Sequence, residues 1–211
     1  DMVLAVGGGF VNDCAKVVAA GACYDGDPWD LVITPRWIKK ALPIYSVLTL
    51  SATGSEMDPF AVISDMSKNE KWGTSSEHMK PKMSILDPEY TYSVSKKQTA
   101  AGTADMISHI CENYFTNVKN ADVQARFAEG LLKNCFKYGP IALEEPDNYD
   151  ARANLMWTAS MAINGILSDG AEVSWCVHPM EHELSAFYDI THGEGLAILT
   201  PHWMEFALND D

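Results

Sequence analysis

The sequence predicts an α/β domain with a parallel, Rossmann-like sheet, followed by an all-helical domain. Up to about residue 92, short β-rich runs alternate with a helical run and with turns rich in glycine, proline and hydroxyl residues. From residue 93 onward, apolar residues recur at helical spacing between clear stop signals. We therefore divide the chain into an α/β domain over 1–92 and a helical domain over 93–211.

Five β-rich runs and one helical run account for the first domain. The β-rich runs are bounded by turn residues, so each is expected to be a strand. The expected strands are Val3–Val6, Leu31–Thr34, Tyr45–Leu50, Ala61–Ser64 and Met83–Leu86. Between the first two, Val11–Ala22 places apolar residues at helical spacing. This strand-helix-strand unit indicates a parallel sheet.

Capping and stop signals define the helices of the second domain. Ser95-x-x-Gln98 is a capping box that opens a helix expected to run to about Asn117. The stretch Tyr138-Gly139-Pro140 is expected to end the next helix, because proline cannot continue it. A third helix, from Ala151 to about Leu167, is expected to be capped by Asp147 or Asn148.

The composition excludes several classes of protein. A hydrophobic content of 47% over 211 residues is ordinary for a globular protein with a core. The 29 Asp and Glu residues outnumber the 15 Lys and Arg residues, so neither nucleic acid nor an anionic membrane is the expected partner. No apolar run approaches the roughly 20 residues that span a bilayer. We expect a cytoplasmic protein.

The cysteines and the two ends of the chain add two expectations. The five cysteines are widely spaced and form no C-x2-C pair, so we expect reduced core residues rather than disulfides or a thiolate zinc site. The first strand starts without the elements that should flank it, and the last residues resemble a helix that stops midway. We therefore expect an internal segment of a longer protein, which lacks the beginning of the α/β domain and the end of the helical domain.

Two turns in the first domain indicate a nucleotide site. Gly7-Gly8-Gly9 separates a strand from a helix, where a bare backbone lets a phosphate approach free N–H groups at the positive end of the helix dipole. The turn from Thr49 to Glu56 is rich in hydroxyls and follows an expected strand, where open α/β sheets bind nucleotides. The alternative is that the glycines form a purely structural turn and the hydroxyls satisfy only local backbone groups.

Four of the six histidines fall into two clusters that suit a divalent metal ion. Asp105 and His109 are four residues apart on an expected helix, so both side chains leave one face a turn apart. His178 and His182 share that spacing, although the proline between them is expected to kink or start their helix, and His192 follows. Nitrogen and carboxylate ligands admit iron(II), zinc, manganese or nickel. The alternatives are a surface hydrogen bond for the first pair and core packing for a single histidine.

The residues resemble the iron-containing (group III) alcohol dehydrogenases, and within them the butanol dehydrogenase and aldehyde reductase branch. The matching stretches follow the family's order along the whole chain: Gly7-Gly8-Gly9 with Asp13, Thr49 to Glu56, Leu86-Asp87-Pro88, Ala101 to His109, and His178 to Pro201. The last stretch is the most specific. The resemblance implies a dinucleotide-binding α/β domain, a helical domain that binds the metal, and an active site between them.

The resemblance also implies a role for each candidate residue. The implied metal ligands are Asp105, His109, His178 and His192. His182 is implied to stay unligated beside the nicotinamide, where it can relay a proton because the unperturbed pKa of histidine lies near the working pH. The implied dinucleotide contacts are Gly8, Gly9, Asp13, Thr49, Thr53 and Asp58, with Lys71 placed to reach the dinucleotide too. Phe10 departs from the family's usual serine.

The implied activity is that of a metal-dependent alcohol dehydrogenase or aldehyde reductase. Such an enzyme would use Fe²⁺, or Zn²⁺ or another divalent ion, with NADH or NADPH, and would act on a small aliphatic substrate such as butanol or butanal. We expect a homodimer or a higher homo-oligomer. A polyol dehydrogenase of the same superfamily and a catalytically silent metal-binding fragment remain alternatives. A related sugar-phosphate cyclase should need a basic cluster, for which Lys80, Lys82, Lys96 and Lys97 are poor candidates.

Overall fold

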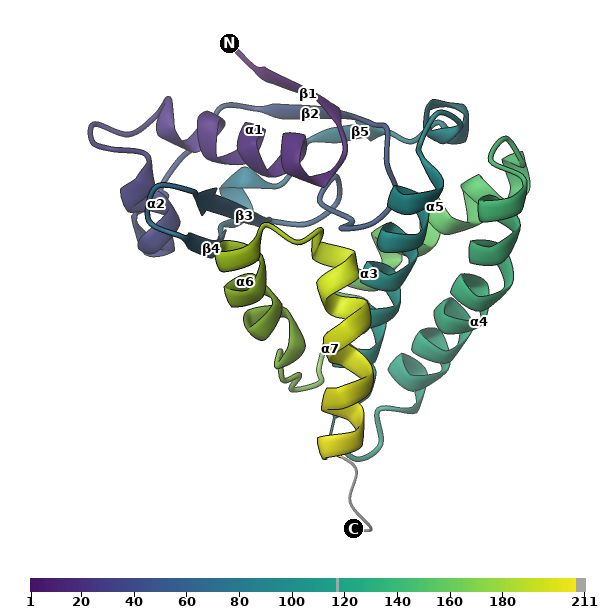
Figure 1. The fold of residues 1–211 in the computed structure, drawn as a ribbon. Coiled ribbons are helices and arrows are strands. Elements are labelled where there is room, and N and C mark those ends of the chain that lie inside the picture. Colours follow the sequence, from purple (N-terminus) through teal and green to yellow (C-terminus); the bar gives the residue numbers. More distant parts are fainter. Residues whose placement is uncertain (117, 208–211) are drawn as a thin grey trace.

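A three-stranded parallel sheet forms the first part of the molecule, as the sequence predicts. The computed structural model describes residues 1–116 and 118–207, and Figure 1 shows the α/β part above the helical part. The strands β1 (Val3–Gly7), β2 (Ile44–Leu48) and β5 (Met83–Ile85) lie in the order β1-β2-β5. Both pairings are parallel, with Val3 opposite Ile44 and Tyr45 opposite Met83.

Helix α1 (Gly9–Gly21) connects β1 to β2 and packs against both strands. The expected strand Leu31–Thr34 is wrong, because these residues belong mostly to the short helix α2 (Trp29–Ile33), followed by the 3₁₀ turn η1 (Pro35–Trp37). Asp27 accepts a hydrogen bond from the Trp29 backbone N–H at 2.9 Å, which starts the helical turn. A short buried apolar run does not by itself distinguish strand from helix.

The strands β3 (Phe60–Asp65) and β4 (Glu70–Ser75) form an antiparallel hairpin outside the parallel sheet. The strand expected over Ala61–Ser64 is thus confirmed, but β4 was not predicted, because its sequence is polar and contains a glycine. The hairpin turn includes Asn69 in the left-handed region, with φ of 53°. Two 3₁₀ turns, η2 (Glu77–Met79) and η3 (Pro88–Thr91), flank β5.

In the described residues of the second part, the helices are α3 (Lys96–Tyr114), α4 (Asp122–Glu144), α5 (Tyr149–Ile163), α6 (Val177–Tyr188) and α7 (His192–Ala207). The predicted caps are confirmed, because Ser95 accepts from Gln98 N–H at 3.2 Å and Asn148 accepts from Ala151 N–H at 3.0 Å. Residue 117, where α3 was expected to end, lies outside the described residues. No helix in the described ranges is both long and apolar enough to cross a membrane.

Two predicted helix ends are wrong. Helix α4 continues through Pro140 to Glu144, because Gly139 is a point of close packing rather than a stop. A Cβ at Gly139 would lie 2.8 Å from Thr103 Cγ2 on α3. Helix α5 ends at Ile163, four residues before the predicted Leu167, which packs in the helical core beyond the helix.

The hydroxyl-rich turn after β2 joins the two parts of the molecule. A Cβ at Gly102 of α3 would lie 2.5 Å from the carbonyl oxygen of Ser51, and one at Gly54 would lie 2.6 Å from the carbonyl oxygen of Ala159. Glycine at these two positions therefore lets the turn approach the α3 and α5 backbones closely. This packing places the turn beside the part of α3 that carries Asp105.

Candidate metal centre and cofactor cleft

Two neighbouring clefts bring the candidate residues of both parts together. The larger cleft has a volume of about 540 Å³ and is lined by Asp13, Asp58, Lys71, His109, His178 and His182, among others. The second, of about 430 Å³, is lined by Gly8, Gly9, Thr49 and Asp105, among others. Phe10, Thr53 and His192 line both clefts. The glycine turn, the hydroxyl turn and the histidines thus share one region.

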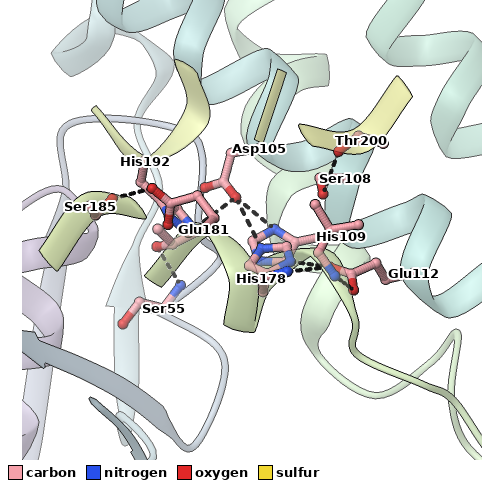
Figure 2. Close-up of polar contacts among 12 residues, drawn as sticks. Ser55, Asp105, Ser108, His109, Glu112, His178, Glu181, Ser185, His192 and Thr200 are labelled. Carbon is pink, nitrogen blue, oxygen red and sulfur yellow. Dashed lines mark hydrogen bonds and ion pairs between the residues drawn. The ribbon is translucent and has the colours of Figure 1, made fainter. Parts of the chain in front are cut away.

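Asp105 lies at the centre of the histidine cluster, and Figure 2 shows the three imidazoles around its carboxylate. Its Oδ1 atom is 3.4 Å from His109 Nδ1, 3.6 Å from His178 Nε2 and 3.7 Å from His192 Nε2. The last two distances are too long for hydrogen bonds. Tetrahedral ligands bound about 2.1 Å from one ion stand about 3.4 Å apart. The separations of the three imidazoles from Asp105 are therefore those expected between ligands of a shared divalent ion.

The hydrogen-bonding state of these atoms also fits a metal ion. Within 1–116 and 118–207, six buried side-chain nitrogen or oxygen atoms have no hydrogen-bond partner, and three of them are Asp105 Oδ1, His109 Nδ1 and His178 Nε2. Leaving such atoms unpaired is costly, so an external partner is expected. The mutually close group comprises Asp105, His178 and His192, with ligand atoms within 4.8 Å of one another. His109 joins it through Asp105 and stacks on His178, with ring centroids 4.4 Å apart.

Two buried glutamates orient two of the imidazoles. His178 Nδ1 contacts Glu112 Oε2, and His192 Nδ1 contacts Glu181 Oε2. Because each Nδ1 faces a carboxylate, each Nε2 points toward Asp105 and is free to bind a metal. Sequence reasoning missed both glutamates. Glu112 stands three residues after His109 on α3, so the pattern Asp-x3-His-x2-Glu on one helix face could have revealed it.

The same glutamate fixes the start of α6. Glu112 accepts hydrogen bonds from the backbone N–H groups of Cys176, Val177 and His178, at 2.5, 2.7 and 3.2 Å. A carboxylate at a helix N-terminus satisfies otherwise free donors and complements the helix dipole. Pro179 lies in this first turn, where its missing N–H costs nothing. The expectation that the proline starts the helix is confirmed, and His178 and His182 share one helix.

Close packing of α7 on α3 brings His192 to Asp105. A Cβ on Gly193 would overlap the carbonyl oxygen of Ala101, so the two helices approach here through backbone atoms. His192 is the first residue of α7, and the chain reaches it through Asp189, which ends α6 with a φ of 50°. The glycine after His192 is therefore required by the spacing of the two helices.

Burial and charge shift the pKa values of the cluster in different directions. Burial would raise the pKa of Asp105, but His109 and the other imidazoles hold it well below its usual range. Burial lowers the pKa of His109 to about 4. For His178, burial acts in the same direction, but the carboxylates of Asp105 and Glu112 outweigh it and raise the pKa to about 9. Asp105 is therefore ionised at neutral pH, which is the form that binds a metal ion.

His182 lies in the larger cleft beside His192, with ring centroids 5.7 Å apart. Burial first, and the positive charges of Lys71 and His192 next, lower its pKa to about 3. This pKa lies far below that of an unperturbed imidazole, so the His182 ring is neutral at pH 7. It is not a member of the Asp105 group, although it lies close to Glu181 and His192.

The glycine turn offers free backbone donors beside the hydroxyl turn. No side chain caps the first turn of α1, which begins at Gly9. A Cβ at Gly9 would lie 2.5 Å from Thr53 Oγ1, and one at Gly8 would lie 3.1 Å from Leu50 Cβ. Uncapped N–H groups in a cleft of this kind suit a phosphate. Phe10 projects from this turn and is 76% exposed.

The three charged residues expected to contact a dinucleotide are already engaged with protein groups. Asp13 accepts from Ser55 Oγ at 2.5 Å and from Val62 N–H at 2.8 Å. Asp58 Oδ1 accepts from Lys16 Nζ at 2.8 Å. Lys71 Nζ donates to Glu181 Oε2 at 3.0 Å in a partly buried contact. All three line the larger cleft, so the structure places them near the site while giving their charges protein partners.

Comparison with known proteins shows which family the chain belongs to. The profile described as "Iron-containing alcohol dehydrogenase" matches residues 1–88, and the profile of the family's C-terminal domain matches residues 99–210. The chain belongs to the iron-containing alcohol dehydrogenase family. It is 63% identical to NADH-dependent butanol dehydrogenase A of Clostridium acetobutylicum over 211 residues, which are all of this chain and 54% of that relative.

Other members of the iron-containing alcohol dehydrogenase family are similar to this chain in sequence and fold. NADPH-dependent aldehyde reductase YqhD of Escherichia coli is 45% identical, over 94% of this chain and 52% of that protein. The crystal structure of NADH-dependent butanol dehydrogenase A from Thermotoga maritima superposes with a TM-score of 0.94 and is 48% identical, covering 97% of this chain and 52% of that one. The chain thus spans about half the length of these relatives.

Proposed function

We propose that the chain is part of a metal-dependent alcohol dehydrogenase or aldehyde reductase that uses NAD(H) and acts on a small aliphatic alcohol or aldehyde such as butanol or butanal. The observation that carries this proposal is the unpartnered Oδ1 of Asp105, which faces three imidazoles beside the glycine turn. The names of the two butanol dehydrogenases support the choice of NADH and of butanol.

Four residues would hold the ion, namely Asp105, His109, His178 and His192. Iron(II) is the first choice, and Zn²⁺ or another divalent ion suits the same donors. An ion held there would supply Lewis acidity toward the substrate oxygen. The nicotinamide would supply or take up the hydride, and Gly8, Gly9, Thr49 and Thr53 would hold its dinucleotide.

His182 would carry the proton in this scheme. Its neutral imidazole faces the larger cleft and can accept the proton that an alcohol loses on oxidation. A base with so low a pKa holds the proton weakly and passes it on to water, so it acts as a relay rather than a store. In the reverse direction a proton taken up from water passes through the same nitrogen to the oxygen of the reduced aldehyde. Apolar neighbours in the cleft, such as Ile163 and Trp175, suit an aliphatic substrate.

Two histidine substitutions test this assignment. The purified chain is loaded with Fe²⁺ or Co²⁺, its metal content is measured, and NADH oxidation is followed with butanal. His192→Ala should lose metal and turnover together, whereas His182→Ala should keep the metal and lose turnover. His202→Ala, an exposed histidine on α7, is the matched control and should change neither. Equal metal loss in the first two variants would overturn the assignment of ligands.

A metal-binding fragment without turnover is the second candidate. It is favoured by one observation, that the chain spans only 54% of its relative from Clostridium acetobutylicum. Tight metal binding without NADH oxidation by the wild-type chain would support this alternative. No metal binding at all in freshly purified protein would overturn both candidates.

A further inference from the structure

Lys71 and Glu181 form a buried ion pair that joins the β3–β4 hairpin to helix α6. Lys71 Nζ lies 3.0 Å from Glu181 Oε2, and the two side chains are 7% and 0% exposed. Strand β4 packs against α6, and Figure 1 shows β4 at the upper end of that helix. The pair therefore crosses from the α/β part to the helical part beside the metal cluster.

One oxygen atom of Glu181 contacts residues from both parts of the molecule. Its Oε2 accepts from Lys71 Nζ and contacts His192 Nδ1, while its Oε1 accepts from Ser185 Oγ. Lys71 Nζ itself lies 3.3 Å from His192 Nδ1. Figure 2 shows Glu181 between His192 and Ser185. The orientation of the His192 ring thus depends on where this carboxylate is held.

The two glutamates of the site are stabilised in different ways. Glu112 has three backbone N–H donors from the start of α6 in addition to His178. Within the described residues, Glu181 accepts from no backbone N–H, and its carboxylate is met by the side chains of Lys71, Ser185 and His192. A buried carboxylate that loses its only cationic side chain is strongly destabilised. Lys71 therefore supplies a fixed positive charge to Glu181, whereas Glu112 is also held by backbone N–H groups.

We propose that Lys71 is a positioning residue for His192, acting through Glu181. The ammonium group offsets the charge of Glu181 and fixes its carboxylate, which holds His192 Nδ1 and directs Nε2 toward Asp105. The inference rests on the proposed metal centre. It gives Lys71 a role other than the dinucleotide contact expected from the sequence, and it connects the hairpin that lines the larger cleft to the geometry of the metal ligands.

Lys71→Met tests the proposal, with Lys68→Met as the matched control. Lys68 belongs to the same hairpin but pairs with Asp65 at 3.0 Å and is 54% exposed. Co²⁺ affinity is measured by competition with a chelator, and the Co²⁺ absorption spectrum reports the coordination. Lys71→Met should weaken Co²⁺ binding about 10- to 100-fold and change the spectrum. Lys71→Arg should restore part of the affinity, and Lys68→Met should match the wild type.

Binding of NADH to the metal-free chain separates the two roles of Lys71. Followed by NADH fluorescence, it should be unchanged in Lys71→Met. Unchanged Co²⁺ affinity together with weakened NADH binding would overturn the proposal in favour of a dinucleotide contact. Unchanged Co²⁺ affinity with a lower Tm alone would reduce Lys71 to a structural role. If the wild-type chain binds no Co²⁺, the proposed function itself fails, and this inference with it.

A double variant keeps the test decisive if Lys71→Met does not fold. Lys71→Met with Glu181→Gln removes both charges and leaves an amide oxygen that can still accept from His192. Its Tm should recover, because no buried charge is left unpaired. Its Co²⁺ affinity should stay below that of the wild type, because a neutral amide is a weaker acceptor than a carboxylate. Full wild-type affinity in the double variant would overturn the proposal.

Discussion

Two groups of buried charges face the larger cleft, and they differ in how their atoms are paired. In the α/β part, Lys16 donates to Ser55 Oγ, Asp58 Oδ1 and the carbonyl oxygen of Phe60 at 2.8, 2.8 and 2.6 Å. In the helical part, Asp105 Oδ1 has no hydrogen-bond partner among the described residues. Both groups combine carboxylates with cationic or cation-forming side chains, yet only the second leaves ligand atoms free.

This difference in atom pairing distinguishes a structural group of charges from a group that can bind a ligand. The ammonium of Lys16 acts as a built-in cation that ties α1 to the hydroxyl turn and to β3. Among the described residues, no lysine or arginine pairs with Asp105, and the separations around its carboxylate suit an ion from solution. Type and burial of the residues alone do not distinguish the two groups. The hydrogen-bond pairing of individual atoms distinguishes them. The same criterion bears on Asp13 and Asp58, which either contact a dinucleotide or support the wall of its cleft.

Removing the cation of the paired group should have the largest effect on stability. Lys16 is fully buried, so Lys16→Met leaves Asp58 as an unpaired buried charge. The free energy of unfolding should fall by about 3 to 5 kcal/mol, measured by urea denaturation. Lys16→Met with Asp58→Asn should recover most of this loss. A loss below about 1 kcal/mol in the single variant would show that the ion pair is not structural.

Asp105→Asn should show the opposite pattern. The substitution removes the carboxylate that the three imidazoles share, so Co²⁺ affinity should fall more than about 100-fold, beyond the usual cost of losing a supporting group. The Tm of the metal-free chain should change less than in Lys16→Met, because the loss of Asp105 leaves imidazoles that can become neutral rather than a fixed buried charge. Intact Co²⁺ affinity would contradict the comparison between the two groups.

The stability of the metal-free chain should depend on pH through His178. Its pKa is raised from 6.5 to about 9 in the folded chain, so the stabilisation is complete below pH 6.5 and is lost as pH rises through 9. Tm should therefore fall over this range in the metal-free chain. Co²⁺ affinity should rise over the same range, because the metal displaces the proton. Glu112→Gln, which removes one carboxylate neighbour, should flatten both trends; equal slopes in this variant would contradict the assignment.

The smallest effect is expected at the glycine turn. Phe10→Ser places a hydroxyl beside the uncapped first turn of α1, where one more hydrogen bond to a phosphate is worth about 0.5 to 1.5 kcal/mol. NADH affinity should rise by about 2- to 10-fold in fluorescence titrations. Val18→Ser, on an exposed face of the same helix, is the control and should leave NADH affinity unchanged. Weaker NADH binding in Phe10→Ser would indicate that the aromatic ring itself contacts the cofactor.

The sequence predicted where strands and helices lie better than it predicted the contacts between them. The parallel strands β1, β2 and β5 and the caps at Ser95 and Asn148 follow from local signals, and the structure confirms them. Gly139 was misread as a stop because its reason is tertiary, namely the approach of α4 to Thr103. Local sequence does not report such contacts.

The candidate site shows the same limit. Spacing on one helix brought Asp105 and His109 together, and the structure adds His178 and His192 from two other helices. Which nitrogen of each ring faces Asp105 depends on Glu112 and Glu181, and their contacts span 66 and 11 residues of sequence. The low pKa of His182 likewise arises from burial and from a lysine on a distant strand, neither of which the spacing of the histidines encodes.

The backbone contact of Gly193 with Ala101 has a consequence for motion in the chain. Helix α3 carries two of the four proposed ligands and one orienting carboxylate on a single rigid segment, whereas α6 and α7 carry one ligand each. A bound ion would connect these three helices where α7 already touches α3. Amide protons of α6 should therefore exchange with solvent far more slowly once the ion is bound, while those of α4, which contributes no ligand, keep their rates.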